Sequence, residues 1–249
     1  MDITRLTLLI TGGGTGIGRG LAAAFHARGA KVIITGRREA PLREVAEANP
    51  GMAWATLDMD DPAAIRAFAD TVVRDHPGLN GVIHNAGIMK TEDLTAEPFD
   101  LMTAEAIITT NLLGPIRLTA GLLPHLKAQP AATLMTVTSG LAFIPLTATP
   151  TYNATKAALH SWTISLRDQL RDSAVEVLEL APPGVATDLM PGHADNPASM
   201  PLADYIAEVM SLIEAGDTPR GEILVERVKP LREAESSGNW DQVFAMLNR

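Results

Sequence analysis

The chain has 249 residues, 46% of them hydrophobic, and a formal charge of −9 from 29 acidic against 20 basic residues. This length can bury one large core, and an acidic balance without any basic run argues against a nucleic-acid-binding surface. Cysteine is absent, which excludes disulfides and thiol chemistry and fits a reducing compartment. The apolar stretch at the N-terminus is too short for a signal sequence or a membrane span, so we expect a soluble, cytoplasmic protein.

Short apolar runs alternate with helical patterns along the chain. Several runs are apolar without alternation, which is typical of strands covered on both faces in a parallel sheet. The predicted strands span residues 6–11, 31–35, 52–57, 81–87, 132–139, 175–184 and 222–226. The predicted helices span residues 16–28, 39–48, 62–76, 99–128 and 153–171. This alternation predicts an α/β fold, a Rossmann-type doubly wound parallel sheet of about seven strands in a single domain covering 1–249.

Two segments fall outside this alternation. Residues 188–201 read "DLMPGHADNPASMP", and a loop of this length inside a compact domain is usually functional or mobile. We expect it to be a substrate lid, the alternative being a surface insertion without a role. Residues 227–249 form a C-terminal tail with no predicted strand or helix.

A glycine-dense turn follows the first predicted strand and precedes a helix. Gly12, Gly16 and Gly18 let the backbone turn sharply and approach a bulky anion, which the helix N-terminus then attracts. The turn lacks the Gly-Lys-Ser/Thr ending of a nucleoside-triphosphate loop. Its position in an alternating α/β chain predicts a site for the phosphates of a dinucleotide.

Five motifs stand in register along the sequence: "TGGGTGIG" at 11–18, "NAG" at 85–87, Ser139, "YNATK" at 152–156 and "PPG" at 182–184. Together they resemble the short-chain dehydrogenase/reductase family, from about residue 4 to residue 226. The resemblance implies hydride transfer between a nicotinamide and a carbonyl or alcohol.

The residues of the predicted catalytic group explain how this chemistry would proceed. Tyr152 and Lys156 lie one helical turn apart, so the ammonium can lower the pKa of the phenol from its usual value of about 10. Tyr152 would then give a proton to the substrate oxygen or take one from it, while Ser139 hydrogen-bonds the same oxygen. In the alternative reading, Tyr152 packs, Lys156 is solvated and Ser139 caps a turn.

The resemblance also assigns roles to other residues. Asn111 would distort its helix and hold a water that links the lysine to solvent, Asp58 would accept from the adenine amino group, and Thr187 would anchor the nicotinamide carboxamide. Asn111 could instead satisfy local backbone groups, and Asp58 could be a turn aspartate. The predicted catalytic residues are Ser139, Tyr152, Lys156 and Asn111. The predicted cofactor-binding residues are Gly12, Thr15, Gly16, Ile17, Gly18, Arg37, Arg38, Asp58, Met59, Asn85, Ala86, Gly87, Tyr152, Lys156, Pro182, Gly184, Val185 and Thr187.

The end of the second predicted strand bears on the choice of cofactor. NAD-linked relatives carry an acid there that accepts from the ribose 2′-hydroxyl, and this chain has Gly36 followed by Arg37 and Arg38. No carboxylate would repel a 2′-phosphate, and a guanidinium can bind it. Thr15 stands where many NADP-linked relatives carry a second basic residue. We therefore expect a preference for NADP(H) over NAD(H), without a large ratio.

Apolar side chains near the predicted site suggest a hydrophobic substrate. The expected pocket walls are Leu141, Phe143, Ile144, Leu189, Met190 and Met200. No metal is expected, because His84, His125, His160 and His193 have no metal-ligand spacing, and the first three are interpreted as structural.

The sequence thus predicts an NADP(H)-dependent oxidoreductase acting on the carbonyl or secondary alcohol of a small or medium hydrophobic molecule. The alternatives are an NAD-linked alcohol dehydrogenase of the same fold and a non-catalytic nucleotide-binding sensor. A sugar-nucleotide epimerase would need a larger C-terminal domain. The resemblance also implies a homodimer or homotetramer built on residues 99–128 and 153–171. The unusual tail puts the tetramer in doubt.

Overall fold

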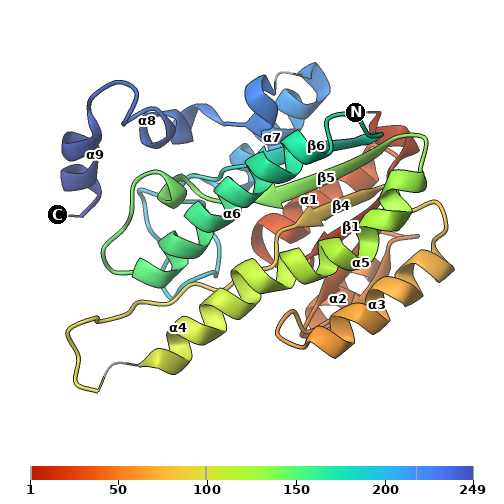
Figure 1. Cartoon of the computed structure of the whole chain (residues 1–249), viewed down its shortest axis with the longest axis horizontal. Helices are drawn as coiled ribbons and strands as arrows, with labels where there is room; N and C mark the ends of the chain where they lie inside the picture. Colours follow the sequence, from red (N-terminus) through yellow and green to blue (C-terminus); the bar gives the residue numbers. More distant parts are fainter. Residues whose placement is uncertain (1, 99, 217, 249) are drawn as a thin grey trace.

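A seven-stranded sheet in which each pair of neighbours runs parallel forms the centre of the molecule (Figure 1). The computed structural model describes residues 2–98, 100–216 and 218–248. The strands lie in the order β3-β2-β1-β4-β5-β6-β7. They are β1 (Thr7–Thr11), β2 (Lys31–Gly36), β3 (Ala53–Thr56), β4 (Gly81–His84), β5 (Ala132–Val137), β6 (Val175–Leu180) and β7 (Glu222–Ile223). The predicted doubly wound parallel sheet is therefore confirmed, with its reversal of strand order between β1 and β4.

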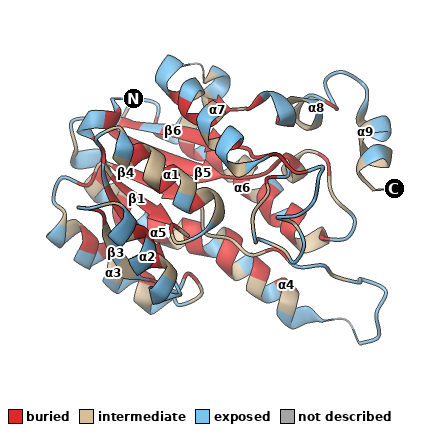
Figure 2. Cartoon of the chain, turned by 180° about the vertical axis from the view of Figure 1, so that it is seen from behind, coloured by how far each residue is buried: buried red, intermediate tan, exposed pale blue. Residues whose placement is uncertain are grey.

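Helices cover both faces of the sheet (Figures 1 and 2). The first buried cluster unites one sheet face with α1, α2 and α7, and the second unites the other face with α3, α5 and α6. The larger helices are α1 (Gly16–Ala27), α2 (Glu39–Ala48), α3 (Pro62–Asp75), α4 (Leu101–Ile108), α5 (Gly114–Ala128), α6 (Pro150–Gln169), α7 (Leu202–Ala215) and α9 (Trp240–Leu247). The shorter ones are η1 (Ile3–Arg5), η2 (Thr109–Leu113), η3 (Gly140–Ala142), η4 (Pro219–Gly221), η5 (Glu226–Val228) and α8 (Lys229–Arg232).

Strand β1 shows why the apolar runs of the sequence do not alternate. Leu8 and Ile10 point into the first cluster, while Leu9 between them points into the second. All three side chains are at most 2% exposed. A strand buried on both faces needs apolar residues at every position, which is the pattern that the sequence carries.

The strands end earlier than the apolar runs predict. The runs 81–87, 132–139 and 175–184 leave the sheet after His84, Val137 and Leu180, respectively. The residues beyond these points form the loops at the carboxyl edge, where ligands of open α/β sheets bind. Because these strands end early, "NAG", Ser139 and "PPG" lie in loops along the carboxyl edge of the sheet.

The predicted helix 99–128 is three helical segments in the structure, since a π-helical turn, η2, separates α4 from α5. Phe99, in the predicted helix, lies outside the described residues. Among the described residues, Leu101–Ala128 is the one helical stretch long and apolar enough to cross a membrane, and 44% of its most apolar window is buried. Its apolar character is explained by this burial, since α5 contributes Leu118, Leu122 and Leu126 to the second cluster.

Three helices of the C-terminal part are absent from the sequence prediction: α7, α8 and α9. Helix α7 contributes Val209, Met210 and Ile213 to the core and ends at Gly216 in a left-handed conformation. Helix α9 has no buried residue and lies at the edge of the molecule (Figure 2). The predicted tail is therefore a folded segment.

Candidate active site

The glycine turn between β1 and α1 is built as the sequence predicts. Gly12 and Gly16 have φ values of 68° and 53°, in the left-handed region that favours glycine. A Cβ on Gly18 would lie 2.2 Å from the carbonyl oxygen of Gly12, so no larger residue fits. Asn85 braces the turn, because its Nδ2 donates to the carbonyls of Thr11 and Gly12 at 3.0 and 3.3 Å.

A groove runs along the carboxyl edge of the strands on the β2 side of the glycine turn. Eight predicted cofactor-binding residues line it: Gly12, Thr15, Arg37, Arg38, Asp58, Met59, Ala86 and Gly87. Thr15 makes no side-chain capping bond at the start of α1, so the helix presents free N–H groups at this turn. The turn, these donors and the two arginines fit the phosphates of a dinucleotide cofactor. Asp58 also accepts from the N–H of Asp60 at 3.1 Å. This bond agrees as well with the alternative interpretation, in which Asp58 is a turn aspartate.

The other predicted cofactor-binding residues lie beside this groove. Thr187 contacts the glycine turn, since its Cβ lies 3.4 Å from where a Cβ of Gly16 would be. The "PPG" segment is tied to the end of the 188–201 loop, because Met200 donates to the carbonyl of Gly184 at 2.7 Å. His193 of that loop folds back, with Nε2 3.8 Å from where a Cβ of Gly184 would be. The loop thus contacts Gly184 at both of these points.

Ser139, Tyr152 and Lys156 come together at the same edge of the sheet. Helix α6 begins at Pro150, three residues before its predicted start, so Tyr152 lies in its first turn. The Lys156 Nζ donates to the carbonyl of Val137 at 2.7 Å and lies 5.5 Å from the centroid of the Tyr152 ring. Lys156 is only 4% exposed, so the reading in which it is solvated is wrong. Ser139 does cap the turn η3, since its Oγ accepts from the N–H of Leu141 at 3.1 Å.

Burial shifts the pKa values of both titratable members of this group. It raises the pKa of Tyr152 to about 12, and a hydrogen bond with Ser139 acts in the opposite direction. It lowers the pKa of Lys156 to about 8. The net shift of the Tyr152 pKa is therefore upward, opposite to the expected lowering, because desolvation by burial is the largest cause. Tyr152 keeps its proton at neutral pH, which suits a proton donor.

Asn111 lies in the π-helical turn η2, and its amide group is fully used. Its Oδ1 accepts from the N–H of Ile88 at 2.8 Å, while Nδ2 donates to the Ile88 carbonyl at 2.9 Å and approaches the Thr155 hydroxyl at 3.3 Å. The expected distortion of the helix at Asn111 is therefore present. The contacts with local backbone groups, which were the alternative role of Asn111, are present as well. A Cβ on Gly87 would lie 3.3 Å from Oδ1 and 3.8 Å from the Lys156 Nζ, so these two groups converge on one glycine. The water-holding role of Asn111 stays a prediction.

An apolar cluster packs around Tyr152, and its members overlap only partly with the predicted walls of the substrate pocket. Its members are Met89, Ile107, Ile88, Leu141, Leu146 and Met190. Only Leu141 and Met190 were predicted. Met200 belongs to the main core and Leu189 is 38% exposed, while Ile144 is fully buried outside this cluster. Phe143 is turned away, with its ring 5.0 Å from that of His160. The position of Ile88 and Met89 directly after "NAG" is the signal that could have identified them.

Asn248, near the C-terminal end of the described chain, supports one side of this cluster. The Oδ1 of Asn248 accepts from the N–H of Thr147 at 2.7 Å, and Nδ2 donates to the carbonyl of Pro145 at 3.0 Å. These bonds hold the loop that carries Leu146. The end of the described chain is therefore part of the structure around Tyr152.

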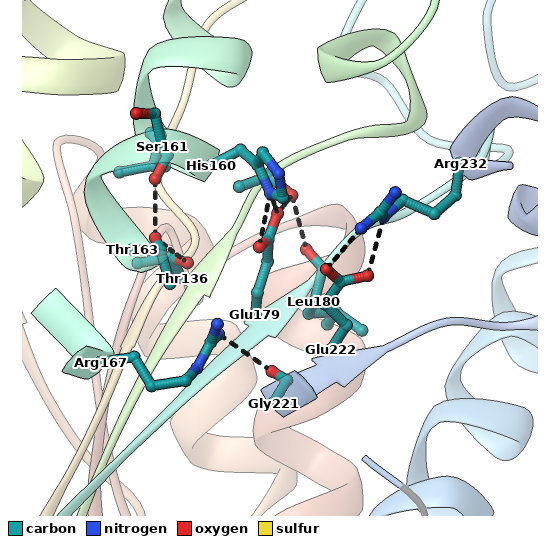
Figure 3. Close-up of polar contacts among 12 residues, drawn as sticks. Thr136, His160, Ser161, Thr163, Arg167, Glu179, Leu180, Gly221, Glu222 and Arg232 are labelled. Carbon is teal, nitrogen blue, oxygen red and sulfur yellow. Dashed lines mark hydrogen bonds and ion pairs between the residues drawn. The ribbon is translucent and has the colours of Figure 1, made fainter. Parts of the chain in front are cut away.

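Three of the four histidines considered above are explained by local contacts. His84 is buried, its Nε2 lies 2.8 Å from the Thr119 hydroxyl, and burial lowers its pKa to about 4. His125 contacts the carbonyl of Leu79 at 2.9 Å. His160 contacts both carboxylate oxygens of Glu179 at 2.9 and 2.8 Å (Figure 3).

His160 and Glu179 lie beside a third potential ligand, Glu222. Their ligand atoms all lie within 4.8 Å of one another, the spacing of a possible metal site. Arg232, however, binds both oxygens of Glu222 at 2.9 and 2.8 Å (Figure 3). A guanidinium in this position repels a cation, so the cluster is best described as an ion-pair network.

Comparisons with known proteins agree with this geometry. The family model of the short chain dehydrogenases matches residues 6–197. The uncharacterized oxidoreductase DltE of Bacillus subtilis (strain 168) is 38% identical over 252 residues, which cover 100% of this chain and 98% of the relative. The 11-beta-hydroxysteroid dehydrogenase-like 3 of Arabidopsis thaliana is 30% identical over 200 residues, covering 77% of this chain and 63% of the relative.

Solved structures give the same fold. A short chain dehydrogenase from Burkholderia cenocepacia J2315 in complex with NADP superposes with a TM-score of 0.82 at 22% identity, covering 99% of both chains. The 3-ketoacyl-(acyl-carrier-protein) reductase from Brucella melitensis, complexed with NADH, has a TM-score of 0.75 at 26% identity, covering 83% of this chain and 90% of its own. With the site geometry, these matches show that the chain belongs to the short-chain dehydrogenase/reductase family, whose members are oxidoreductases that bind a nicotinamide cofactor.

Proposed function

We propose that the protein is an NADP(H)-dependent reductase that transfers hydride between the nicotinamide and a carbonyl or secondary alcohol. The observation that carries this proposal is the buried group of Ser139, Tyr152 and Lys156, in which Tyr152 packs within an apolar cluster. A phenol with a pKa of about 12 is protonated at neutral pH, so it supports carbonyl reduction, in which a proton must be donated.

Each residue of the group contributes a separate step. The nicotinamide, when bound, supplies or accepts the hydride. Tyr152 gives its phenolic proton to the oxygen of the carbonyl, and the Ser139 hydroxyl hydrogen-bonds that oxygen and holds its developing charge. Lys156 places a positive charge 5.5 Å from the phenol ring, which stabilises the phenolate left after proton donation. The apolar side chains around Tyr152 exclude water and strengthen these interactions.

The preference for NADP(H) rests on the end of β2. Arg37 and Arg38 line the groove next to Gly36, and position 36 offers no carboxylate to repel a 2′-phosphate. Family relatives do not decide the matter, because the Burkholderia protein carries NADP and the Brucella reductase carries NADH. The chain's own arginines therefore carry this part of the proposal.

A double substitution tests the cofactor preference. Gly36→Asp with Arg37→Gln introduces a ribose acceptor and removes the first-choice phosphate ligand, so the preference should move toward NADH. The matched control is Arg43→Gln on the exposed face of α2, which should leave the preference unchanged. The measurement is kcat/KM with NADPH and with NADH at one salt concentration. An unchanged ratio in the double variant would refute the role of these positions.

The proposed substrate class rests on the apolar cluster around Tyr152. Met89, Ile107 and the apolar residues beside them favour a small or medium hydrophobic carbonyl compound. An NAD-linked alcohol dehydrogenase would share the site but would prefer NADH. A nucleotide-binding sensor would bind the cofactor without turnover. We disfavour this alternative, because a protein that only binds the nucleotide has no need to bury Lys156 and Tyr152 together.

Assembly and location are also proposals. We propose a homodimer or homotetramer, supported by exposed apolar side chains on α4 and α6, and action in the cytoplasm, supported by the absence of cysteine. We further propose that the loop 188–201 closes over cofactor and substrate. Its contacts with Gly184 place it beside the predicted cofactor-binding segment.

A further inference from the structure

Glu179 on β6 is a fully buried carboxylate next to the catalytic serine. It accepts a hydrogen bond of 2.6 Å from the hydroxyl of Thr138, the residue before Ser139. On the other side of the serine, the N–H of Gly140 donates to the carbonyl of Pro182 at 2.8 Å. Both neighbours of Ser139 are therefore tied to the end of β6, one of them through the Glu179 side chain.

The same carboxylate also holds the helix that carries the catalytic tyrosine. The Nδ1 of His160 lies 2.9 and 2.8 Å from its two oxygens (Figure 3). His160 follows Lys156 by one helical turn and Tyr152 by two. Glu179 thus connects β5, which leads to Ser139, with α6, which carries the proton donor.

The contacts of Glu179 and His160 continue to further charged and aromatic groups, and together they form a network. Arg232 binds both oxygens of Glu222 and lies 4.8 Å from the centroid of the Phe143 ring. Phe143 in turn packs edge-on against His160. Buried carboxylates are costly unless they are paired or hydrogen-bonded. Here Arg232 pairs with Glu222, and Thr138 and His160 contact Glu179. The network fixes Glu179 in one position rather than leaving it a freely moving side chain.

We propose that Glu179 is a positioning residue for Ser139, acting through the Thr138 hydroxyl. This inference rests on the proposed function, in which Ser139 and Tyr152 meet at one substrate oxygen. Both residues must keep their hydrogen-bond distances to that oxygen, and displacements near 1 Å can lower the rate by about 100-fold. Without the link to Glu179, Thr138 would keep its backbone bond to the Leu180 carbonyl at 2.9 Å and a long contact of 3.5 Å from its hydroxyl to the same carbonyl.

Glu179→Gln is the central test variant. An amide of the same shape offers one acceptor oxygen, so it cannot accept from both the Thr138 hydroxyl and a His160 Nδ1 that carries the proton. The expected result is a fall in kcat of about 10- to 100-fold with NADPH affinity unchanged. Hydride transfer should also become more rate-limiting, so the isotope effect with NADPH deuterated at the transferred position should rise. A loss of folded protein alone would not change that isotope effect.

Two substitutions of Thr138 test whether Glu179 acts through the Thr138 hydroxyl. Thr138→Val removes the hydroxyl and should reproduce the effects of Glu179→Gln, and the two changes combined should not add. Thr138→Ser keeps a hydroxyl and should restore near wild-type values. Glu222→Gln is the matched control, because it disturbs the network through Arg232 without touching Thr138. It should lower the thermal midpoint and leave the isotope effect as in the wild type.

The outcomes separate this inference from the proposed function. A wild-type protein that oxidises NADPH with a carbonyl, together with a Glu179→Gln variant of normal kcat and isotope effect, overturns the inference alone. Equal isotope effects in Glu179→Gln and Glu222→Gln would also overturn it. A wild-type protein without carbonyl-dependent turnover would overturn the proposed function, and the inference with it.

Discussion

At the scale of single residues, burial governs the pKa values of Tyr152 and Lys156, the proposed catalytic pair. Desolvation disfavours the charged form of either group, so it raises the pKa of Tyr152 to about 12 and lowers that of Lys156 to about 8. At neutral pH the phenol is therefore protonated and the ammonium is charged. This is the state in which a carbonyl oxygen can receive a proton.

The first prediction concerns the proton donor. Tyr152→Phe should lower kcat by about 10²–10⁴-fold, the usual contribution of general acid catalysis, while cofactor binding changes little. The chain's other tyrosine provides the control, because Tyr205 is fully buried and its hydroxyl has no partner among the described residues. Tyr205→Phe should keep wild-type turnover. Near-normal turnover in Tyr152→Phe at neutral pH would show that another group donates the proton.

The second prediction concerns the buried lysine. Its pKa falls from 10.5 in the unfolded chain to about 8, so the folded state binds the proton less well. Below about pH 8 the buried charge therefore costs about 3 kcal/mol of stability, and this cost disappears as the pH rises to 10.5. Lys156→Met removes the cost and loses the bond to Val137, worth about 1 kcal/mol. The variant should be inactive yet about 2 kcal/mol more stable at pH 7.

Denaturant unfolding at pH 7 and pH 10 tests the lysine prediction. Wild-type stability should rise relative to that of Lys156→Met between these two values. Lys127→Met, at an exposed position of α5, is the control and should follow the wild type. A Lys156→Met variant less stable than the wild type at pH 7 would contradict the account of burial. Wild-type activity should also fall as the pH rises above about 8, because Lys156 then loses its charge.

At the scale of elements, local patterns identified the parts of the site that one segment builds. The glycine turn and Tyr152-x-x-x-Lys156 each lie within one turn or helix, so spacing alone relates their residues. Contacts between distant segments could not be predicted this way. Asn248 contacts residues about one hundred positions earlier, and the Phe143 ring packs against His160 rather than in the cluster around Tyr152. The raised pKa of Tyr152 likewise depends on burial, which no motif records.

The third prediction concerns the loop 188–201. If it closes over the site, its amide groups should exchange more slowly in the presence of NADPH and a substrate analogue than in the free protein. The β-bridge between Val185 and Met200 anchors the end of the loop, so protection should increase most between residues 189 and 198. Residues 91–96, also exposed at this edge, are the internal comparison. Identical exchange in both states would exclude a closing lid.

At the scale of the whole molecule, two neighbouring helices carry apolar side chains that the rest of the described chain leaves exposed. Helices α4 and α6 contact each other and carry exposed apolar side chains, among them Met102 at 80%, Ile108 at 40% and Ile164 at 45%. Exposed apolar clusters of this kind mark interaction surfaces. A second copy of the chain, related by a twofold axis, would bury this surface on both partners.

The fourth prediction concerns this association. Light scattering at micromolar concentration should give a mass of two or four times the 26.4 kDa chain. Ile108→Lys combined with Ile164→Lys should shift the protein toward a monomer. Met246→Lys is the matched control, since this methionine is 70% exposed but lies on α9. A stable monomer of the wild-type protein would refute the proposed oligomer.

The fifth prediction is the central claim, that this fold carries out nicotinamide-dependent carbonyl chemistry with a preference for NADP(H). The measurement is the loss of reduced-nicotinamide absorbance with a panel of hydrophobic ketones and aldehydes, run with NADPH and NADH side by side. The account predicts carbonyl-dependent oxidation that is more efficient with NADPH. Equal or better efficiency with NADH would contradict the role of Arg37 and Arg38. No carbonyl-dependent oxidation with either cofactor would contradict the proposed reaction itself.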